Sequence, residues 1–253
     1  MVLRYGSPTS SVPSLSWCGE AETCRSCRIL IAVQQFAVAV PGRQAVVLMS
    51  NTKHWDEIYS SKPSDKVGWY TPHLDTPLNW IEGLNLEPDE AIIDVGGGAS
   101  TLVDDLLAKG HKDITIVDLS RRAIQLTQER LGKISSLVTW LQGDVTRLEL
   151  PDHYYRLWHD RAVFHFLLEP EIRQRYKDAL LEALQMDGFF ILGTFAPEAP
   201  PRCSGLPVQR YDAQSLARLF GSEFELRLSQ YEPHVTPSGI EQAYVYCLFQ
   251  RTA

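Results

Sequence analysis

Three aspartates and a run of glycines carry the clearest chemical signal in this sequence. Asp94 and the glycines Gly96–Gly98 belong to or follow a short apolar run, Asp118 ends a second apolar run, and Asp144 follows a third. Glycines at such a point let the chain turn sharply and let a ligand come close to the backbone. An acid about 20 residues beyond them can accept hydrogen bonds from the two hydroxyls of a ribose. The pattern therefore predicts a site for a nucleoside ligand.

Two other interpretations of the glycine run stay open. The glycines can serve only as a tight turn, because short glycine motifs often match by chance. They can also bind a nicotinamide dinucleotide, although the G-x-G-x-x-G pattern needs a third glycine where this chain has Thr101. Asp94 would be unfavourable beside a pyrophosphate and favourable beside a cationic ligand. A nicotinamide-dependent oxidoreductase is thus one alternative, and a protein that binds the donor without catalysis is another.

The elements that position these residues alternate along the chain. Apolar runs predict five strands, over 91–95, 114–117, 138–141, 154–158 and 189–195. Amphipathic spacing predicts helices over 101–109, 120–131, 171–185 and 212–220. Such alternation indicates a parallel sheet with helices on both faces. Two closing strands, over 224–231 and 243–250, are expected to be antiparallel to each other.

Four short motifs then resemble a known superfamily. Residues 93–98 (IDVGGG), 117–120 (VDLS), 143–145 (GDV) and 184–189 (LQMDGF) are similar, in order, to the motifs of class I S-adenosylmethionine-dependent methyltransferases. The resemblance covers about residues 51–251. It implies an α/β, Rossmann-like, seven-stranded and mostly parallel sheet with an antiparallel last strand, helices on both faces, and S-adenosylmethionine as methyl donor.

The resemblance also implies a role for each motif. The glycine loop would pass the methionine part of the donor, with Asp94 near its amino group, and Asp118 would hold the ribose hydroxyls. Asp144 would approach the adenine amino group, and Val145 would supply a backbone contact. The donor-binding residues implied in this way are Asp94, Gly96, Gly97, Gly98, Asp118, Leu119, Asp144 and Val145.

The stretch after the fourth strand is where an acceptor lies in this fold. Asp160 is a candidate to accept a hydrogen bond from an amine, and His159 and His165 are candidates to take a proton near neutral pH. The same residues can instead cap a helix or pack in the core. Residues 55–59 (WDEIY), 69–70 (WY) and 159–166 (HDRAVFHF) resemble a bacterial branch of the superfamily. Within the last of these, residues 160–164 (DRAVF) are also similar, at their Asp and Phe, to the lysine methyltransferases of citrate synthase and elongation factors.

Aromatic residues near the start of the domain are candidates for a lid. Trp69 and Tyr70 precede Pro72 on an expected loop, and Trp55 and Tyr59 lie upstream. Aromatic faces attract a sulfonium or an ammonium, although such residues can also simply pack a helix onto the sheet. The proline-rich loop over 197–207 follows the fifth strand, so Arg202, Cys203 and Ser204 are candidates to line the acceptor pocket.

Composition limits the possible partners. The 253 residues carry a net charge of −7, which disfavours a nucleic-acid-binding protein, and no apolar run is long enough for a transmembrane helix. Five cysteines, an odd number, favour a reducing compartment, so we expect a cytoplasmic protein without a metal site. The expected acceptor is a small molecule or a protein side chain.

Residues 1–48 differ from the rest of the chain. They lack Lys, Asp, Asn and His but hold three cysteines. We interpret Met49 as the functional start, with residues 1–48 as a poorly structured extension and residues 49–253 as the methyltransferase domain. The alternative is an organelle-targeting segment, because its arginines outnumber its acids.

Overall fold

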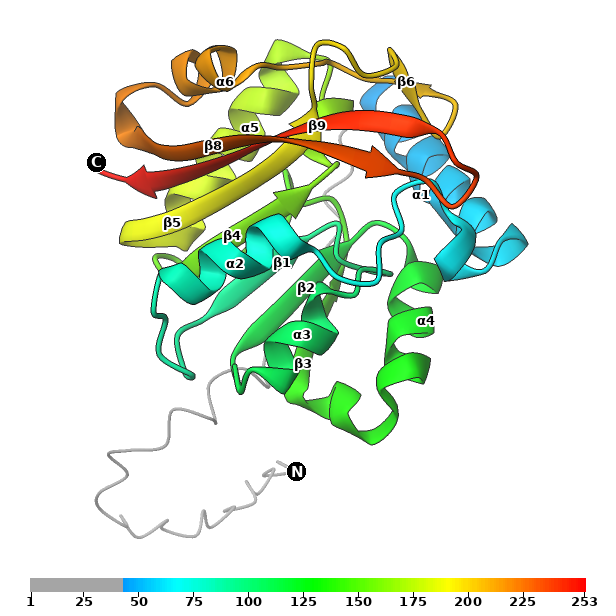
Figure 1. Ribbon diagram of the computed structural model, residues 1–253, viewed down its shortest axis with the longest axis horizontal. Helices are drawn as coiled ribbons and strands as arrows, with labels where there is room; N and C mark the ends of the chain where they lie inside the picture. The colour runs from blue at the N-terminus through cyan, green and yellow to red at the C-terminus, as the bar shows by residue number, and fades with distance from the viewer. Residues whose placement is uncertain (1–42) are drawn as a thin grey trace, which may run out of the picture. The chain divides into compact units, whose positions relative to one another are not determined.

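Seven strands form one sheet in the computed structural model, which describes residues 43–253, with side chains from Thr52 onward (Figure 1). The strand order is β3-β2-β1-β4-β5-β9-β8. The first five strands along the chain are parallel, and β9 is antiparallel to both β5 and β8. This confirms the predicted sheet. The strands are β1 (Ile92–Val95), β2 (Ile114–Asp118), β3 (Val138–Gln142), β4 (Tyr155–Arg161), β5 (Leu184–Phe195), β8 (Phe224–Val235) and β9 (Glu241–Arg251).

Helices cover both faces of this sheet. In Figure 1, α2 and α3 lie in front of the strands and α5 lies behind them. Two apolar clusters match these layers: Leu102 and Leu106 of α3 pack with Ile92, and Tyr176 of α5 packs with Ile93 on the other face. The helices are α1 (Arg43–Ser61), α2 (Asp75–Gly83), α3 (Leu102–Ala108), α4 (Arg121–Leu131), α5 (Pro170–Ala183) and α6 (Ala213–Phe220).

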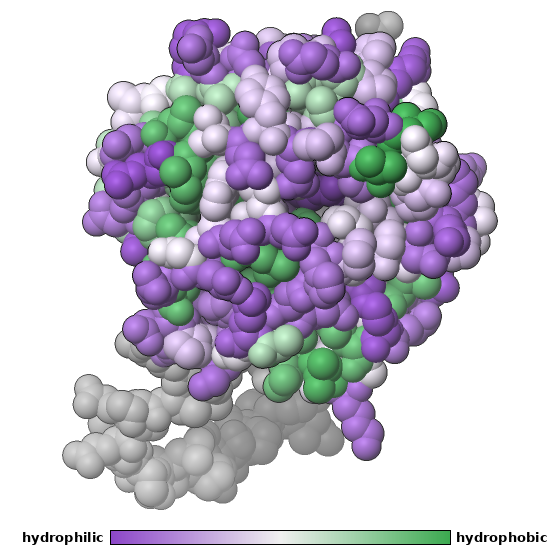
Figure 2. All heavy atoms as spheres, in the orientation of Figure 1, coloured by the Kyte–Doolittle hydropathy of each residue, from purple (hydrophilic) through white to green (hydrophobic). Residues whose placement is uncertain are grey.

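Shorter elements connect the main ones. A small hairpin, β6 (Arg202–Cys203) with β7 (Leu206–Pro207), stands apart from the main sheet. Four 3-10 turns complete the described chain: η2 (Ser64–Lys66), η3 (Gly132–Leu137), η4 (Phe164–Phe166) and η5 (Gly221–Glu223). Polar side chains cover most of the face in Figure 2, and hydrophobic groups on it are small and separate. No helix in residues 43–253 is both long and apolar enough to cross a membrane.

Local signals explain where several helices begin. The Ser120 side chain accepts a hydrogen bond from the Ala123 N–H and so caps α4. Asp212 and Ser215 form a reciprocal capping box at α6. Pro170 stands in the first turn of α5, where its missing N–H costs nothing.

One predicted boundary was wrong. The helix predicted over 171–185 ends at Ala183, and the strand predicted over 189–195 already begins at Leu184, as β5. The register with β4 shifts there, from Tyr155 opposite Leu184 to Leu157 opposite Phe189, and Asp187 has a φ of 59°. The Asp-Gly signal therefore marks a bulge in a strand rather than its start.

The N-terminal prediction is largely outside the described part of the chain. Residues 1–42 fall outside it, whereas α1 begins at Arg43 and continues through Met49. The boundary at Met49 stays a prediction.

Candidate functional site

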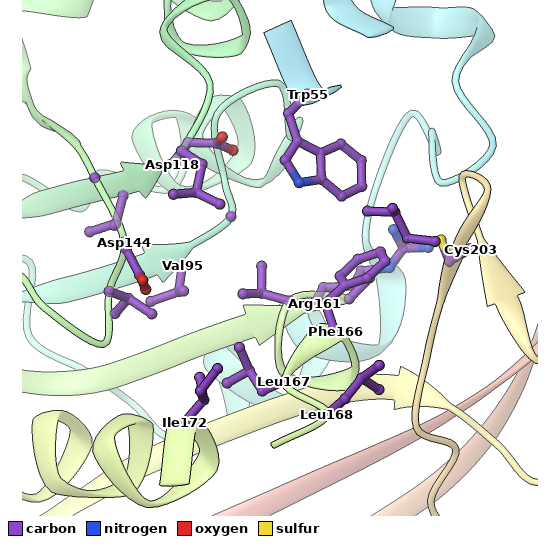
Figure 3. Close-up of a pocket in the computed structure, with 18 of the residues that line it drawn as sticks. Trp55, Val95, Asp118, Asp144, Arg161, Phe166, Leu167, Leu168, Ile172 and Cys203 are labelled. Atoms are coloured by element: carbon purple, nitrogen blue, oxygen red, sulfur yellow. The ribbon is translucent and has the colours of Figure 1, made fainter. Parts of the chain in front are cut away.

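The carboxyl ends of β1, β2, β3 and β4 surround a cavity of about 760 Å³ (Figure 3). Parallel strands bring their carboxyl ends to one edge, which is where ligands bind in open α/β sheets. The volume lies in the range of about 300–1,000 Å³ that is usual for small-molecule sites. The predicted site residues that line it are Trp69, Gly96, Asp118, Leu119, Asp144 and Val145.

Asp118 is a nearly buried carboxylate at the cavity wall. Its Oδ2 accepts the Gly98 N–H at 3.0 Å, and its Oδ1 accepts the Ser120 N–H at 2.7 Å. Burial raises the pKa of this carboxyl to about 6, against the lowering effect of the two N–H groups. Each oxygen retains a lone pair, so Asp118 can accept two further hydrogen bonds from a diol.

The glycine run wraps around the acids. Gly96 has a φ of +74°, and a Cβ there would lie 2.2 Å from Cγ2 of Val163, which also lines the cavity. A Cβ on Gly97 would lie 2.3 Å from Asp94 Oδ2, and one on Gly98 would lie 2.5 Å from Asp118 Oδ2. The loop therefore requires three residues without side chains to approach these carboxylates and the cavity wall.

Asp94 is paired with a histidine beneath the loop. Its Oδ1 lies 2.7 Å from Nδ1 of His159 on the neighbouring strand, and both side chains are buried. Asp94 Oδ2 has no hydrogen-bond partner among the described residues. Neither Asp94 nor His159 lines the cavity. An orphaned buried carboxylate oxygen under a glycine loop fits a cationic or N–H-bearing ligand.

Asp144 and its neighbours form the far side of the cavity from Trp55 and Cys203 in Figure 3. Asp144 Oδ1 accepts hydrogen bonds from the N–H and the hydroxyl of Thr146, at 3.0 and 2.9 Å. Its Oδ2 is 3.6 Å from the Nε of Arg147, so one oxygen remains free to accept from a ligand amine.

Asp160 and His165, the other two catalytic candidates, are fully buried and do not line the cavity. Asp160 accepts the Tyr176 hydroxyl at 2.7 Å and the Val163 N–H at 3.0 Å, and burial raises its pKa to about 6. The Phe195 N–H donates to Nδ1 of His165 at 3.4 Å, and burial lowers the His165 pKa to about 3. In this conformation these contacts hold the chain around the cavity, and the catalytic roles stay predictions.

An aromatic wall closes one side of the cavity. Trp55 packs edge-on against both Trp69 and Phe166, with ring centroids 5.6 and 5.2 Å apart. The Trp69 indole N–H donates to the Tyr59 hydroxyl at 3.1 Å. All four rings line the cavity, whereas Tyr70, predicted as a partner of Trp69, does not. We call Trp55, Tyr59, Trp69 and Phe166 the aromatic wall.

The β6–β7 hairpin forms the opposite border of this end of the cavity. Cys203, Leu206 and Pro207 line the cavity, whereas Arg202 is exposed and does not. Burial raises the pKa of the Cys203 thiol to about 12, so this thiol is protonated at neutral pH.

Sequence reasoning missed the lining contributed after β4. The region predicted from the sequence ended at Phe166, although the chain continues along the cavity to the first turns of α5. The additional lining residues there are Leu167, Leu168, Glu169, Glu171, Ile172 and Arg175. Arg161, the last residue of β4, is another lining residue whose role the sequence did not indicate.

Comparison with known proteins agrees with this geometry. Residues 92–188 match the family model described as a methyltransferase domain. The mouse eEF1A lysine and N-terminal methyltransferase is 26% identical over 144 residues, which are 54% of this chain and 20% of that protein. The zebrafish EEF1A lysine methyltransferase 2 is 26% identical over 162 residues, 57% of this chain and 68% of that protein. The chain thus spans about a fifth of the mouse relative's length.

Solved structures share the fold at low identity. The 1,6-didemethyltoxoflavin-N1-methyltransferase of Burkholderia thailandensis, solved with S-adenosylhomocysteine, is 20% identical with a TM-score of 0.61, covering 87% of this chain and 94% of that one. Phosphoethanolamine N-methyltransferase 1 of Haemonchus contortus is 15% identical with a TM-score of 0.61, covering 82% of this chain and 50% of that one.

Proposed function

Because this chain belongs to the class I S-adenosylmethionine-dependent methyltransferases, we propose that it binds S-adenosylmethionine in the cavity and transfers its methyl group to an acceptor held at the aromatic wall. The observation that carries the proposal is Asp118. It is a carboxylate oriented by two backbone N–H groups at the carboxyl end of β2, with the glycine loop on one side and the cavity on the other.

The residues present fit the donor in three places. Asp118 would accept from the ribose hydroxyls, and Asp144 with Val145 would meet the adenine ring. The unpartnered Oδ2 of Asp94 lies under the glycine loop, where it would favour the cationic methionine end of the donor. When bound, S-adenosylmethionine supplies an electrophilic methyl group, and the electron pair of the broken carbon–sulfur bond returns to sulfur.

The protein's own contribution to the reaction is alignment. The aromatic wall and the β6–β7 hairpin enclose the end of the cavity away from Asp144, so an acceptor held there would be fixed in orientation (Figure 3). Good alignment of two reactants lowers a barrier by as much as about 7–11 kcal/mol. No lining side chain has to act as a base for this contribution.

A protein lysine is one candidate acceptor. It is supported by the names of the eEF1A methyltransferases that this chain is similar to, at 26% identity or less. A small molecule is the other candidate, and it is supported by the enclosed cavity and by the structural neighbours that methylate small molecules. Either acceptor is compatible with the cytoplasmic location that we predict from the cysteine content.

Isothermal titration with S-adenosylhomocysteine tests the donor site. Replacing Asp118 with Ala should weaken binding by roughly 1–3 kcal/mol, because a buried charged acceptor is lost. The exposed Asp89→Ala variant removes a carboxylate elsewhere and should bind as the wild type does. Unchanged affinity in Asp118→Ala would contradict the ribose role.

Transfer of a tritiated methyl group into fractionated cell lysate tests catalysis. Label in the small-molecule or the protein fraction would identify the acceptor class. Tryptophan quenching by NADH without any response to S-adenosylhomocysteine would instead support an oxidoreductase. Binding of the donor with no labelled product would favour a non-catalytic role.

A further inference from the structure

Arg161 places a positive charge without an ion-pair partner among the described residues in the wall of the cavity. Its Nε donates to the Tyr246 hydroxyl and its Nη1 to the Trp69 carbonyl oxygen, each at 2.8 Å. Its Cζ lies 4.6 Å from the centroid of the Tyr244 ring. These contacts orient the guanidinium, but all three partners are neutral.

No carboxylate of the described residues forms an ion pair with Arg161. Asp160 is adjacent in sequence, but its oxygens bond the Tyr176 hydroxyl and the backbone after β4. Glu232 lies near enough for its charge to raise the pKa of Arg161, but it accepts a hydrogen bond from Thr76 and forms no ion pair with the guanidinium. Asp118 and Asp144 lie toward the other end of the cavity in Figure 3. Arg161 is half-buried, and a partly desolvated charge without an ion-pair partner is unfavourable, which indicates that a ligand supplies the counter-charge.

Two donors on these neighbouring side chains lack a hydrogen-bond partner among the described residues. Nη2 of Arg161 is shielded from water and has no hydrogen-bond partner among the described residues, and the same holds for the Tyr244 hydroxyl. Burial raises the pKa of Tyr244, so its hydroxyl keeps its proton and can donate. Tyr244 packs with Cys203, which lines the cavity. Two buried donors without acceptors match an anionic oxygen group.

The surroundings of these donors are apolar and aromatic. Trp69, whose carbonyl Arg161 holds, belongs to the aromatic wall, and Cys203 with Leu206 borders the same end of the cavity. Figure 3 shows Trp55, Phe166 and Cys203 gathered at this end together with Arg161. A flat organic body would fit between the rings and the hairpin.

We propose that the methyl acceptor is a small organic anion, whose carboxylate or equivalent oxygen group binds Arg161 while its flat body lies against the aromatic wall. This inference rests on the proposed methyltransferase function. It disfavours a lysine acceptor, because an ammonium would be repelled by a guanidinium that has no ion-pair partner.

Matched ligand pairs test the proposal directly. The probes are aromatic carboxylates (benzoate, indole-3-carboxylate and 4-hydroxybenzoate), their neutral amides and benzylamine, titrated calorimetrically into protein saturated with S-adenosylhomocysteine. The carboxylates should bind at least about tenfold tighter than their amides, since a charged hydrogen bond replaces a neutral one. In Arg161→Gln the two should bind within about twofold of each other.

Two further variants separate charge from folding. Arg161→Lys keeps the charge and should retain a preference for carboxylates. Arg202→Gln removes an exposed arginine of the β6–β7 hairpin, near the same end of the cavity, and should leave the preference unchanged. Melting temperature and S-adenosylhomocysteine affinity check that each variant is folded. The comparison of carboxylates with their amides in the wild-type protein does not depend on the folding of any variant.

The outcomes separate this inference from the proposed function. If S-adenosylhomocysteine fails to bind the wild type, the proposed function fails. If it binds, but amides or benzylamine bind as well as the carboxylates, or no probe binds, the inference is overturned. Methyl transfer to a protein lysine that persists in Arg161→Gln would also overturn it.

Discussion

At the scale of single residues, burial and charge have opposing requirements at Asp118. Its carboxylate must be buried to meet a ligand without competition from water, yet burial disfavours its charge. The N–H groups of Gly98 and Ser120 offset part of that cost. The remaining effect is a carboxyl whose pKa is raised to about 6, so it changes charge just below neutral pH.

Donor binding should therefore weaken in mild acid. Above pH 6 the Asp118 carboxylate accepts from the ribose hydroxyls, and below pH 6 protonation removes one acceptor. The affinity for S-adenosylhomocysteine should fall by up to about tenfold per pH unit as the pH drops below 6. Titration calorimetry from pH 5 to 8 measures the slope. The same slope in Asp118→Asn would show that another group titrates.

Gly96 offers a comparison between backbone strain and steric obstruction. Gly96 and Gly110 have φ values of +74° and +91°, so alanine at either costs about 1–2 kcal/mol. Only the Gly96 Cβ would overlap Val163 at the cavity, since nothing lies within 4 Å of the corresponding point at Gly110. Gly96→Ala should therefore lose donor affinity, whereas Gly110→Ala should lose only stability. Calorimetry with S-adenosylhomocysteine and thermal unfolding distinguish them, and equal affinities would contradict the close approach.

At the scale of elements, the side chain of Asp56 in α1 hydrogen-bonds to the start of α4, beside an apolar contact between the two helices. Asp56 Oδ1 accepts the Ser120 hydroxyl at 2.6 Å and the Arg122 N–H at 3.1 Å. The same helix carries Trp55 and Tyr59 of the aromatic wall. The contact therefore couples the position of this wall to the strand-to-helix turn that holds Asp118.

Breaking that contact should loosen α1. Asp56→Ala should lower the free energy of unfolding by about 1–2 kcal/mol, because two donors lose their acceptor. It should also speed amide exchange in α1 and weaken donor binding. The control is Glu57→Ala, which removes only an exposed ion pair with Lys53 on the same helix and should change stability by about 0.5 kcal/mol or less. Unaltered exchange in Asp56→Ala would contradict the coupling.

At the scale of the whole molecule, Asp160 joins the sheet to the helix layer behind it. The carboxylate at the end of β4 accepts from Tyr176 of α5 and from the N–H groups of Val163 and Phe164, all inside the largest apolar cluster. Its position explains why an acid after the fourth strand can be buried. In this arrangement it organises the turn that leads to the cavity wall.

Stability should therefore depend on the charge of Asp160. The pKa is raised from 3.8 to about 6 by burial, so the group's stabilising contribution is complete below pH 3.8 and is lost as the pH rises through 6. Between pH 4 and 6, the free energy of unfolding of the wild type should fall relative to Asp160→Asn, by on the order of 1 kcal/mol per pH unit, and above pH 6 the two should change in parallel. Urea unfolding measures the difference. If the unfolding free energies of the two proteins changed in parallel between pH 4 and 6 as well, and Asp160→Asn abolished methyl transfer, the catalytic role would be supported instead.

The sequence alone determined the order of the elements, and it predicted which acids lie at the edge of the sheet where the donor is proposed to bind. Apolar runs ending in Asp118 and at Gly143–Asp144 predict strands whose carboxyl ends share an edge, because parallel strands linked by helices permit no other arrangement. The glycines that approach those acids could also be predicted from the sequence, since a run of residues without a Cβ directly after a strand is typical of a sharp turn with a close backbone approach.

Only the tertiary structure decided which side chains reach the cavity. Asp160 and Arg161 are neighbours on β4, and a strand sends consecutive side chains to opposite faces. The Asp160 side chain therefore enters the core, and the Arg161 side chain enters the cavity wall. Likewise, the aromatic wall joins α1, a loop and the turn after β4. These contacts span about a hundred residues and depend on packing, which no local pattern encodes.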